Sequence, residues 1–106
     1  MDVALRHLVL ASLRRAGLWS WAEAVPIADR WGRIMVADVA FATARLAVDL
    51  GSSTFAPGGP ARTRLRLAAS GWTLTSYTRA DFEHRATEIT RELRALLDHL
   101  SPTRYP

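Results

Sequence analysis

Two nearly continuous apolar runs, 34–41 and 46–50, are separated by only four residues and constrain the fold of this chain more than any other feature. Short runs without polar alternation are typical of strands that are buried on both faces. A chain reversal about Thr43 and Ala44 would join the two runs as an antiparallel hairpin. The register that follows pairs Phe41 with Leu46, Val39 with Val48, and Asp38 with Asp49.

Asp38 and Asp49 are the only charged residues inside the two runs. In this register they are cross-strand neighbours on one face, with Cβ atoms roughly 5 Å apart. Like charges at that distance repel unless a shared proton, nearby arginines or a divalent metal ion compensates them. Two alternatives stay open: a one-residue slip would send the side chains to opposite faces, and Asp49 could simply accept hydrogen bonds from turn amides near Gly51.

The rest of the chain adds helices and further strands. Apolar spacing predicts helices over 2–16 and 61–70, and extended patterns predict strands at 24–28 and 72–77. Three glycines and two prolines predict an irregular loop over 51–60. A capping box at Thr78 and Asp81 begins the last helix. Its apolar stripe comprises Phe82, Ala86, Ile89, Leu93, Leu96 and Leu100.

The order α-β-β-β-α-β-α predicts an α/β fold with three layers, in which helices flank a mixed four-stranded sheet. We expect the last strand to lie parallel to an earlier one. In the helix over 61–70, we expect Leu65, Leu67 and Ala68 to face inward. The three arginines of that helix, Arg62, Arg64 and Arg66, should face outward.

A length of 106 residues indicates one domain, which we expect over 1–100 with a C-terminal tail at 101–106. Without cysteine the chain has neither disulfides nor a thiolate zinc site. The apolar stretch 8–13 is too short to span a bilayer and lacks the pattern of a usual signal peptide. We therefore expect a soluble intracellular protein that does not associate with membranes, with the cytoplasm as the default location.

All 14 basic residues are arginine, and the net charge is +4. Arginine matches phosphate geometry well, so this balance favours a polyanionic partner such as DNA. Arg62, Arg64 and Arg66 are candidates for contacts with successive phosphates, although a solvated helix face explains them equally well. Without lysine, no lysine amine is available as a base or to orient a metal-bound water.

The pattern of elements and acidic residues resembles a known family. The pattern begins with an Asp near the end of the first hairpin strand (Asp38) and an acidic residue on the second strand (Asp49). A loop, a helix that ends in Gly71-Trp72, and a strand that leads into the Thr78 cap follow. This pattern is similar to the small domains related to the very-short-patch-repair endonuclease, the domain of unknown function 559 group, within the PD-(D/E)XK nuclease superfamily. The resemblance covers almost the whole chain.

The resemblance implies a restriction-endonuclease-like fold and a DNA-cleaving site in which Asp38 and Asp49 hold Mg²⁺. Hard carboxylate oxygens suit magnesium, which would activate water for attack on a phosphodiester. The chain departs from the family pattern at four places. The first helix lacks the glutamate that the family has near its start, since Ala4, Leu5 and Arg6 stand there. Glycine stands at 51, where the family has a second acid; Ser76 replaces an arginine; and no histidine occurs between His7 and His84.

We therefore expect a DNA-binding, nuclease-like domain with degenerate or weak metal-dependent activity. The alternative is a module without catalysis that keeps the fold and binds DNA or protein, with the acidic pair as a relic. A second copy of the chain or another protein that completes the site is the other candidate partner.

Overall fold

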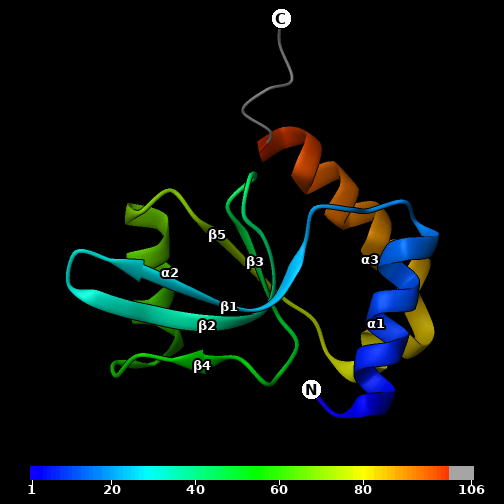
Figure 1. The fold of residues 1–106 in the computed structure, drawn as a ribbon, viewed down its shortest axis with the longest axis horizontal. Helices are drawn as coiled ribbons and strands as arrows, with labels where there is room; N and C mark the ends of the chain where they lie inside the picture. Colours follow the sequence, from blue (N-terminus) through cyan, green and yellow to red (C-terminus); the bar gives the residue numbers. More distant parts are fainter. Residues whose placement is uncertain (101–106) are drawn as a thin grey trace, which may run out of the picture.

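The computed structural model describes residues 1–100, and the predicted tail at 101–106 lies outside the described residues. The described part forms three helices and five strands (Figure 1). Their bounds are α1 Val3–Arg15, β1 Ala22–Asp29, β2 Gly32–Phe41, β3 Leu46–Asp49, β4 Thr54–Phe55, α2 Gly59–Ala69, β5 Thr73–Ser76 and α3 Arg79–Leu100.

The strands form one mixed sheet in the order β1-β2-β3-β5, with β4 also paired to β2. β2 runs antiparallel to both β1 and β3, whereas β5 is parallel to β3. The predicted α/β class, the mixed sheet and the parallel last strand are thus confirmed, but the sheet has five strands and not the predicted four, because β4 joins it. β1 lies at the edge, where Pro26 is tolerated because one side of an edge strand needs no ladder hydrogen bonds.

The hairpin register is confirmed as far as the ladder extends. Val39 pairs with Val48 and Phe41 with Leu46, and the ladder of β2 with β3 ends at Val39. Asp38 and Asp49 occupy the next level but are not a ladder pair.

The prediction of an irregular loop over 51–60 is wrong in part, because β4 forms within it and α2 begins at Gly59. β4 pairs with β2 through Met35↔Phe55 and Val36↔Thr54. The reason is the length of β2: its ten residues extend well past the four of β3, and the remaining backbone groups of that edge need partners. Composition alone signals the glycines and prolines but not this open edge.

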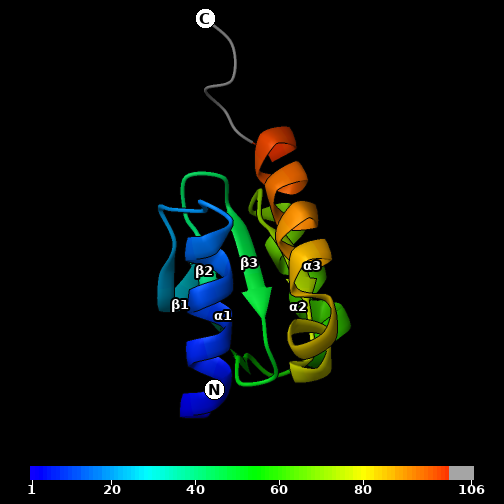
Figure 2. The same cartoon turned by 90° about the vertical axis from the view of Figure 1, so that its right-hand side faces the viewer.

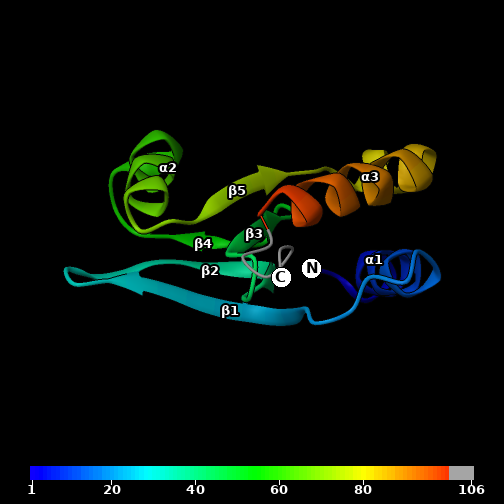
Figure 3. The ribbon, with the colours of Figure 1, turned by 90° about the horizontal axis from the view of Figure 1, so that it is seen from above.

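Helices cover both faces of the sheet, with α1 and α3 on one side and α2 on the other (Figures 1 and 3). β2 and β3 contribute to a core on each face, as the apolar runs predict. The core beneath α1 and α3 includes Leu5, Val9, Leu13, Val39, Phe41, Leu46, Val48, Phe82, Ile89 and Leu93. The core beneath α2 comprises Ile27, Ile34, Met35, Ala37, Ala40, Ala47 and Leu67.

α1 and α3 lie side by side (Figure 2), and each begins at a side-chain cap. Asp2 accepts a hydrogen bond from the Leu5 amide at 2.8 Å. Thr78 and Asp81 cap each other's backbone amides at 2.9 and 3.1 Å, which confirms the capping box. α3 is interrupted at Arg85, where φ is −136° and ψ is 30°, a kink that the periodic pattern does not reveal.

The predicted buried face of α2 is correct at Leu67 but wrong at Leu65 and Ala68, which are both exposed. Leu65 is 73% exposed, whereas Thr63 and Leu67 are buried. Residues 63 and 67 are one helical turn apart and lie on one face, but Leu65 and Leu67 are too far apart around the helix to face the sheet together. The helix ends at Gly71 as predicted, in the left-handed conformation (φ 80°) that glycine adopts easily.

Among residues 1–100, no helix combines the length and the apolar character needed to cross a bilayer.

Candidate functional site at the end of the β2–β3 hairpin

Asp38 lies at the point where two neighbours of β2 separate. β3 pairs with residues 39–41 of β2 and β4 pairs with residues 35–36 along the same edge. The chain between β3 and β4, residues 50–53, therefore leaves the sheet beside Asp38. The Asp38 side chain is buried there, with only 8% of the residue exposed.

The Asp38 carboxylate organises this departing segment. Its Oδ2 accepts hydrogen bonds from the amide of Leu50 at 2.6 Å, the amide of Ser52 at 3.1 Å and the Ser53 hydroxyl at 3.1 Å. The Asp38 amide in turn donates to Ser53 Oγ at 3.0 Å. A buried carboxylate needs such donors, because it has lost its hydration.

Asp49 acts on the same segment from β3. Its Oδ1 accepts a hydrogen bond from the Gly51 amide at 3.0 Å, the turn-amide role that the sequence left open. Its backbone carbonyl accepts the Tyr77 amide at 3.0 Å, which joins the site to the end of β5. The two aspartates thus bind three successive amides, at 50, 51 and 52, and these donors offset the negative charge of both.

The other edge of β2 is also irregular at this level. β1 pairs on either side of Ala24, through Glu23↔Val39 and Val25↔Ala37, but Ala24 itself has φ 50°. A left-handed alanine is strained, and strained backbone inside a strand occurs often at functional sites. The regular ladder is therefore interrupted on both sides of Asp38.

A cavity of about 230 Å³ adjoins this irregular region, and Asp38, Ala24 and Ser52 contribute to its lining. Arg6 and Glu23 lie at the same cavity and form a two-pronged ion pair, with N–O distances of 2.7 and 2.9 Å. The hydrogen bonds from Arg6 lower the pKa of Glu23 below its usual value. Sequence reasoning missed Glu23, because its edge-strand position gives no signal that it shares a cavity with Asp38.

The donor set fits a divalent cation only modestly. The hydrogen bonds engage Asp38 Oδ2 and Asp49 Oδ1, so one oxygen of each carboxylate remains for coordination. Within residues 1–100 no group of three or more His, Cys, Asp or Glu side chains is arranged to hold a metal. A cation held by two oxygens would keep most of its water shell, which magnesium tolerates.

The histidines do not join this site. His7, His84 and His99 are exposed, and none of them lines the cavity beside Asp38. Across the described part of the chain, no histidine is therefore placed as a base beside the two aspartates.

The three arginines of α2 differ in the contacts that they make. Arg66 forms a two-pronged ion pair with Asp29 at 2.7 and 3.0 Å, and it fixes α2 to the β1–β2 turn. Arg64 donates to the Leu74 carbonyl at 3.3 Å, whereas Arg62 is exposed. Of these three arginines, only Arg62 and Arg64 are therefore available to an external ligand. Arg66 does not extend them into a row of contacts with successive phosphates.

Comparisons of this chain with family models, curated proteins and solved structures gave no significant match.

Proposed function

We propose that this chain is a DNA-binding domain on a nuclease-like scaffold, with a weak divalent-cation site at Asp38 and Asp49. The observation that carries the proposal is the position of these two carboxylates at one end of the β2–β3 hairpin, around a shared loop. A parallel strand, β5, follows on the far side of β3, and α2 connects the two. With β4 as an added strand, this order supports the family resemblance on which the proposal rests.

The residues themselves limit the chemistry. If bound, Mg²⁺ would be held by Asp38 and Asp49 and would supply a Lewis acid for phosphate and an acidified water. Activation of that water also needs a base, yet the chain has no lysine and none of its histidines lines the cavity. We therefore infer slow, metal-dependent nicking of DNA and not efficient cleavage.

A module without catalysis is the second candidate, and the hydrogen bonds of Asp38 favour it. Three donors converge on one oxygen of this buried carboxylate, so Asp38 has a structural task that would preserve it even where cleavage is lost. In that case DNA would still contact the basic surface, with Arg62 and Arg64 as the available cations of α2.

The proposal is tested with supercoiled plasmid DNA titrated with Mg²⁺ and with Mn²⁺. The measurement compares the native chain with Asp38→Asn and Asp49→Asn, because asparagine keeps an acceptor oxygen for the loop amides but removes the charge that a cation requires. We expect slow nicking by the native chain. The nicking rate of both variants should fall by at least about 100-fold, because the reaction depends mainly on activation by the metal ion.

The matched control is Glu83→Gln, which removes an exposed carboxylate on α3. It should nick at the native rate. Nicking that survives in both aspartate variants would refute the metal-site proposal. DNA binding without nicking, unchanged in Asp38→Asn, would establish the second candidate.

A further inference from the structure

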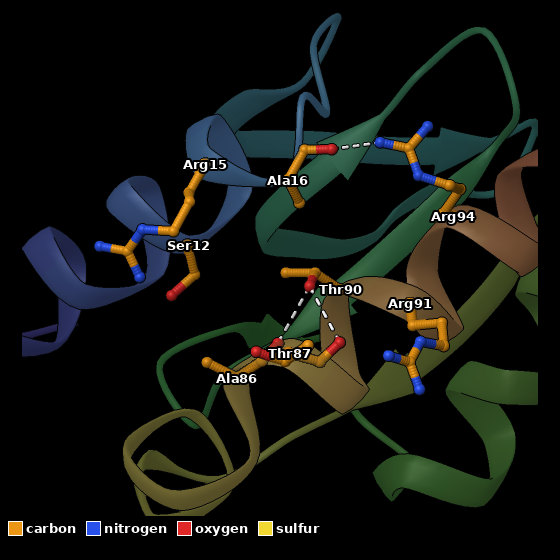
Figure 4. A pocket seen from close by; sticks show the side chains of 8 residues that line it. All are labelled: Ser12, Arg15, Ala16, Ala86, Thr87, Thr90, Arg91 and Arg94. Atoms are coloured by element: carbon orange, nitrogen blue, oxygen red, sulfur yellow. Dashed lines mark hydrogen bonds between the residues drawn. The ribbon is translucent and has the colours of Figure 1, made fainter.

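A groove runs between α1 and α3, on the side of the sheet opposite α2. Its volume is about 440 Å³, within the range of ligand sites. Figure 4 shows Arg15 contributed by α1, and Arg91 and Arg94 contributed by α3. None of the residues that line it is acidic.

Small polar side chains form the floor of the groove. The Ser12 hydroxyl donates to the Leu8 carbonyl at 2.8 Å, and the Thr90 hydroxyl is within 3.1 Å of two carbonyls of its own helix. Both residues are buried. Because these hydroxyl hydrogens are already satisfied, any anion that enters the groove must be recognised by the arginines.

The three arginines differ in how they are held. Arg94 donates to the carbonyl of Ala16 at the end of α1, which fixes its guanidinium across the two helices. Arg15 and Arg91 are exposed, and within residues 1–100 neither side chain forms a hydrogen bond or an ion pair. By contrast, Arg6 and Arg66 each have a carboxylate partner.

Figure 4 shows the unpaired guanidiniums of Arg15 and Arg91 on opposite sides of the groove and pointing away from each other, so both side chains would turn toward an anion that enters it. No acidic side chain lines the groove to balance their charge. A tetrahedral phosphate offers several oxygens to guanidinium donors from opposite walls, and such charge-assisted bonds are about twice as strong as neutral ones. We propose that the α1–α3 groove is a phosphate-binding site with Arg15 and Arg91 as its ligands and Arg94 as its fixed wall. The phosphate belongs either to a nucleic-acid backbone or to a small phosphorylated molecule.

This site is independent of the Asp38–Asp49 site, so its test needs no cleavage. The variant is the double substitution Arg15→Gln with Arg91→Gln, which leaves Arg94 on its carbonyl. The matched control is Arg30→Gln with Arg33→Gln, which removes the same charge from exposed positions at the β1–β2 turn. Two probes at 0.1 M salt separate the sources: a fluorescent 20-base-pair duplex by anisotropy, and inorganic pyrophosphate by calorimetry.

We expect the groove variant to bind at least one probe about 10-fold or more weakly, because each phosphate contact contributes nearly a factor of ten at this salt concentration. The control should lose less than about a third of that effect. A loss for both probes assigns the site to phosphate in general, a loss for the duplex alone assigns it to the nucleic-acid backbone, and a loss for pyrophosphate alone assigns it to small phosphates.

The double lysine variant, Arg15→Lys with Arg91→Lys, separates binding from folding. It keeps the charge and should recover much of the lost affinity, with an unchanged melting temperature in all variants. No binding of either probe by the native chain, or equal losses in the groove variant and the control at the β1–β2 turn, would overturn the proposal.

Discussion

At the scale of single residues, Asp38 is the side chain on which the local structure depends most. Its Oδ2 holds the amides of Leu50 and Ser52 and the hydroxyl of Ser53. Asp38→Ala would leave these donors without an acceptor, and we expect the free energy of unfolding to fall by about 3 kcal/mol. Asp38→Asn, which keeps one acceptor oxygen, should cost only about 1 kcal/mol.

Urea denaturation of the two variants measures this difference. The denaturant slope should stay constant, because the surface exposed on unfolding is the same. Equal stabilities of Asp38→Ala and the native chain would show that the loop does not depend on this carboxylate.

Asp29 and Arg66 form the second residue-level feature, because they connect α2 to the β1–β2 turn. The hydrogen bonds from Arg66 lower the pKa of Asp29, and those to Asp29 raise the pKa of Arg66. A carboxyl whose folded pKa is lowered stabilises the fold above its unfolded pKa of about 3.9, and this contribution disappears as the pH falls through the folded value.

Melting temperatures of the native chain and Asp29→Asn across the acid range test this linkage. At pH 7 the native chain should melt at the higher temperature, and the difference should shrink as the pH falls below about 4. A difference that stays constant down to pH 2.5 would show that the ionised pair contributes nothing.

At the scale of elements, α2 provides the clearest comparison of two similar residues. Leu67 is fully buried, whereas Leu65 is 73% exposed. Leu67→Ala should lower the free energy of unfolding by about 2–5 kcal/mol, since it leaves a cavity in the core beneath α2. Leu65→Ala should change it by less than about 0.5 kcal/mol. Urea denaturation of both variants measures the two changes in the free energy of unfolding. A larger loss of stability in Leu65→Ala than in Leu67→Ala would refute the orientation of the helix.

The same helix shows where sequence reasoning reached its limit. α1 and α3 follow from strong apolar periodicity, and the hairpin follows from its two continuous apolar runs. The Thr78–Asp81 cap has a distinct local pattern. α2 has only two leucines, at 65 and 67, and helical spacing cannot place both inward. β4 forms because β2 is longer than β3, a tertiary cause that the residues around Thr54 do not reveal.

The candidate site was also predictable only in part: the sequence places the two aspartates together but does not give their hydrogen-bond partners. The register of Val39 with Val48 places Asp38 and Asp49 at the same end of the hairpin, as the apolar runs indicate. Their hydrogen bonds to the amides of 50–52 depend on the path of the loop, which its glycine and serines leave undetermined. Glu23 joins the cavity beside Asp38 only because β1 pairs with β2.

At the scale of the whole molecule, the sheet separates two sets of charges. α2 carries Arg62 and Arg64 on one side, and the α1–α3 groove carries Arg15 and Arg91 on the other. Asp38 and Asp49 lie at one end of the β2–β3 hairpin, beside the loop at 50–53. A nuclease-like role requires DNA to reach this carboxylate end, whereas a binding module requires only one of the basic surfaces.

The measurement that tests the central claim most directly is the binding of Mn²⁺ to the folded chain, followed by paramagnetic broadening of backbone amide signals. Bound Mn²⁺ at Asp38 and Asp49 should broaden the amides of 49–53 first, and Asp49→Asn should abolish the effect while the spectrum stays folded. Broadening centred elsewhere, or none at millimolar Mn²⁺, would contradict a cation site at the end of the β2–β3 hairpin.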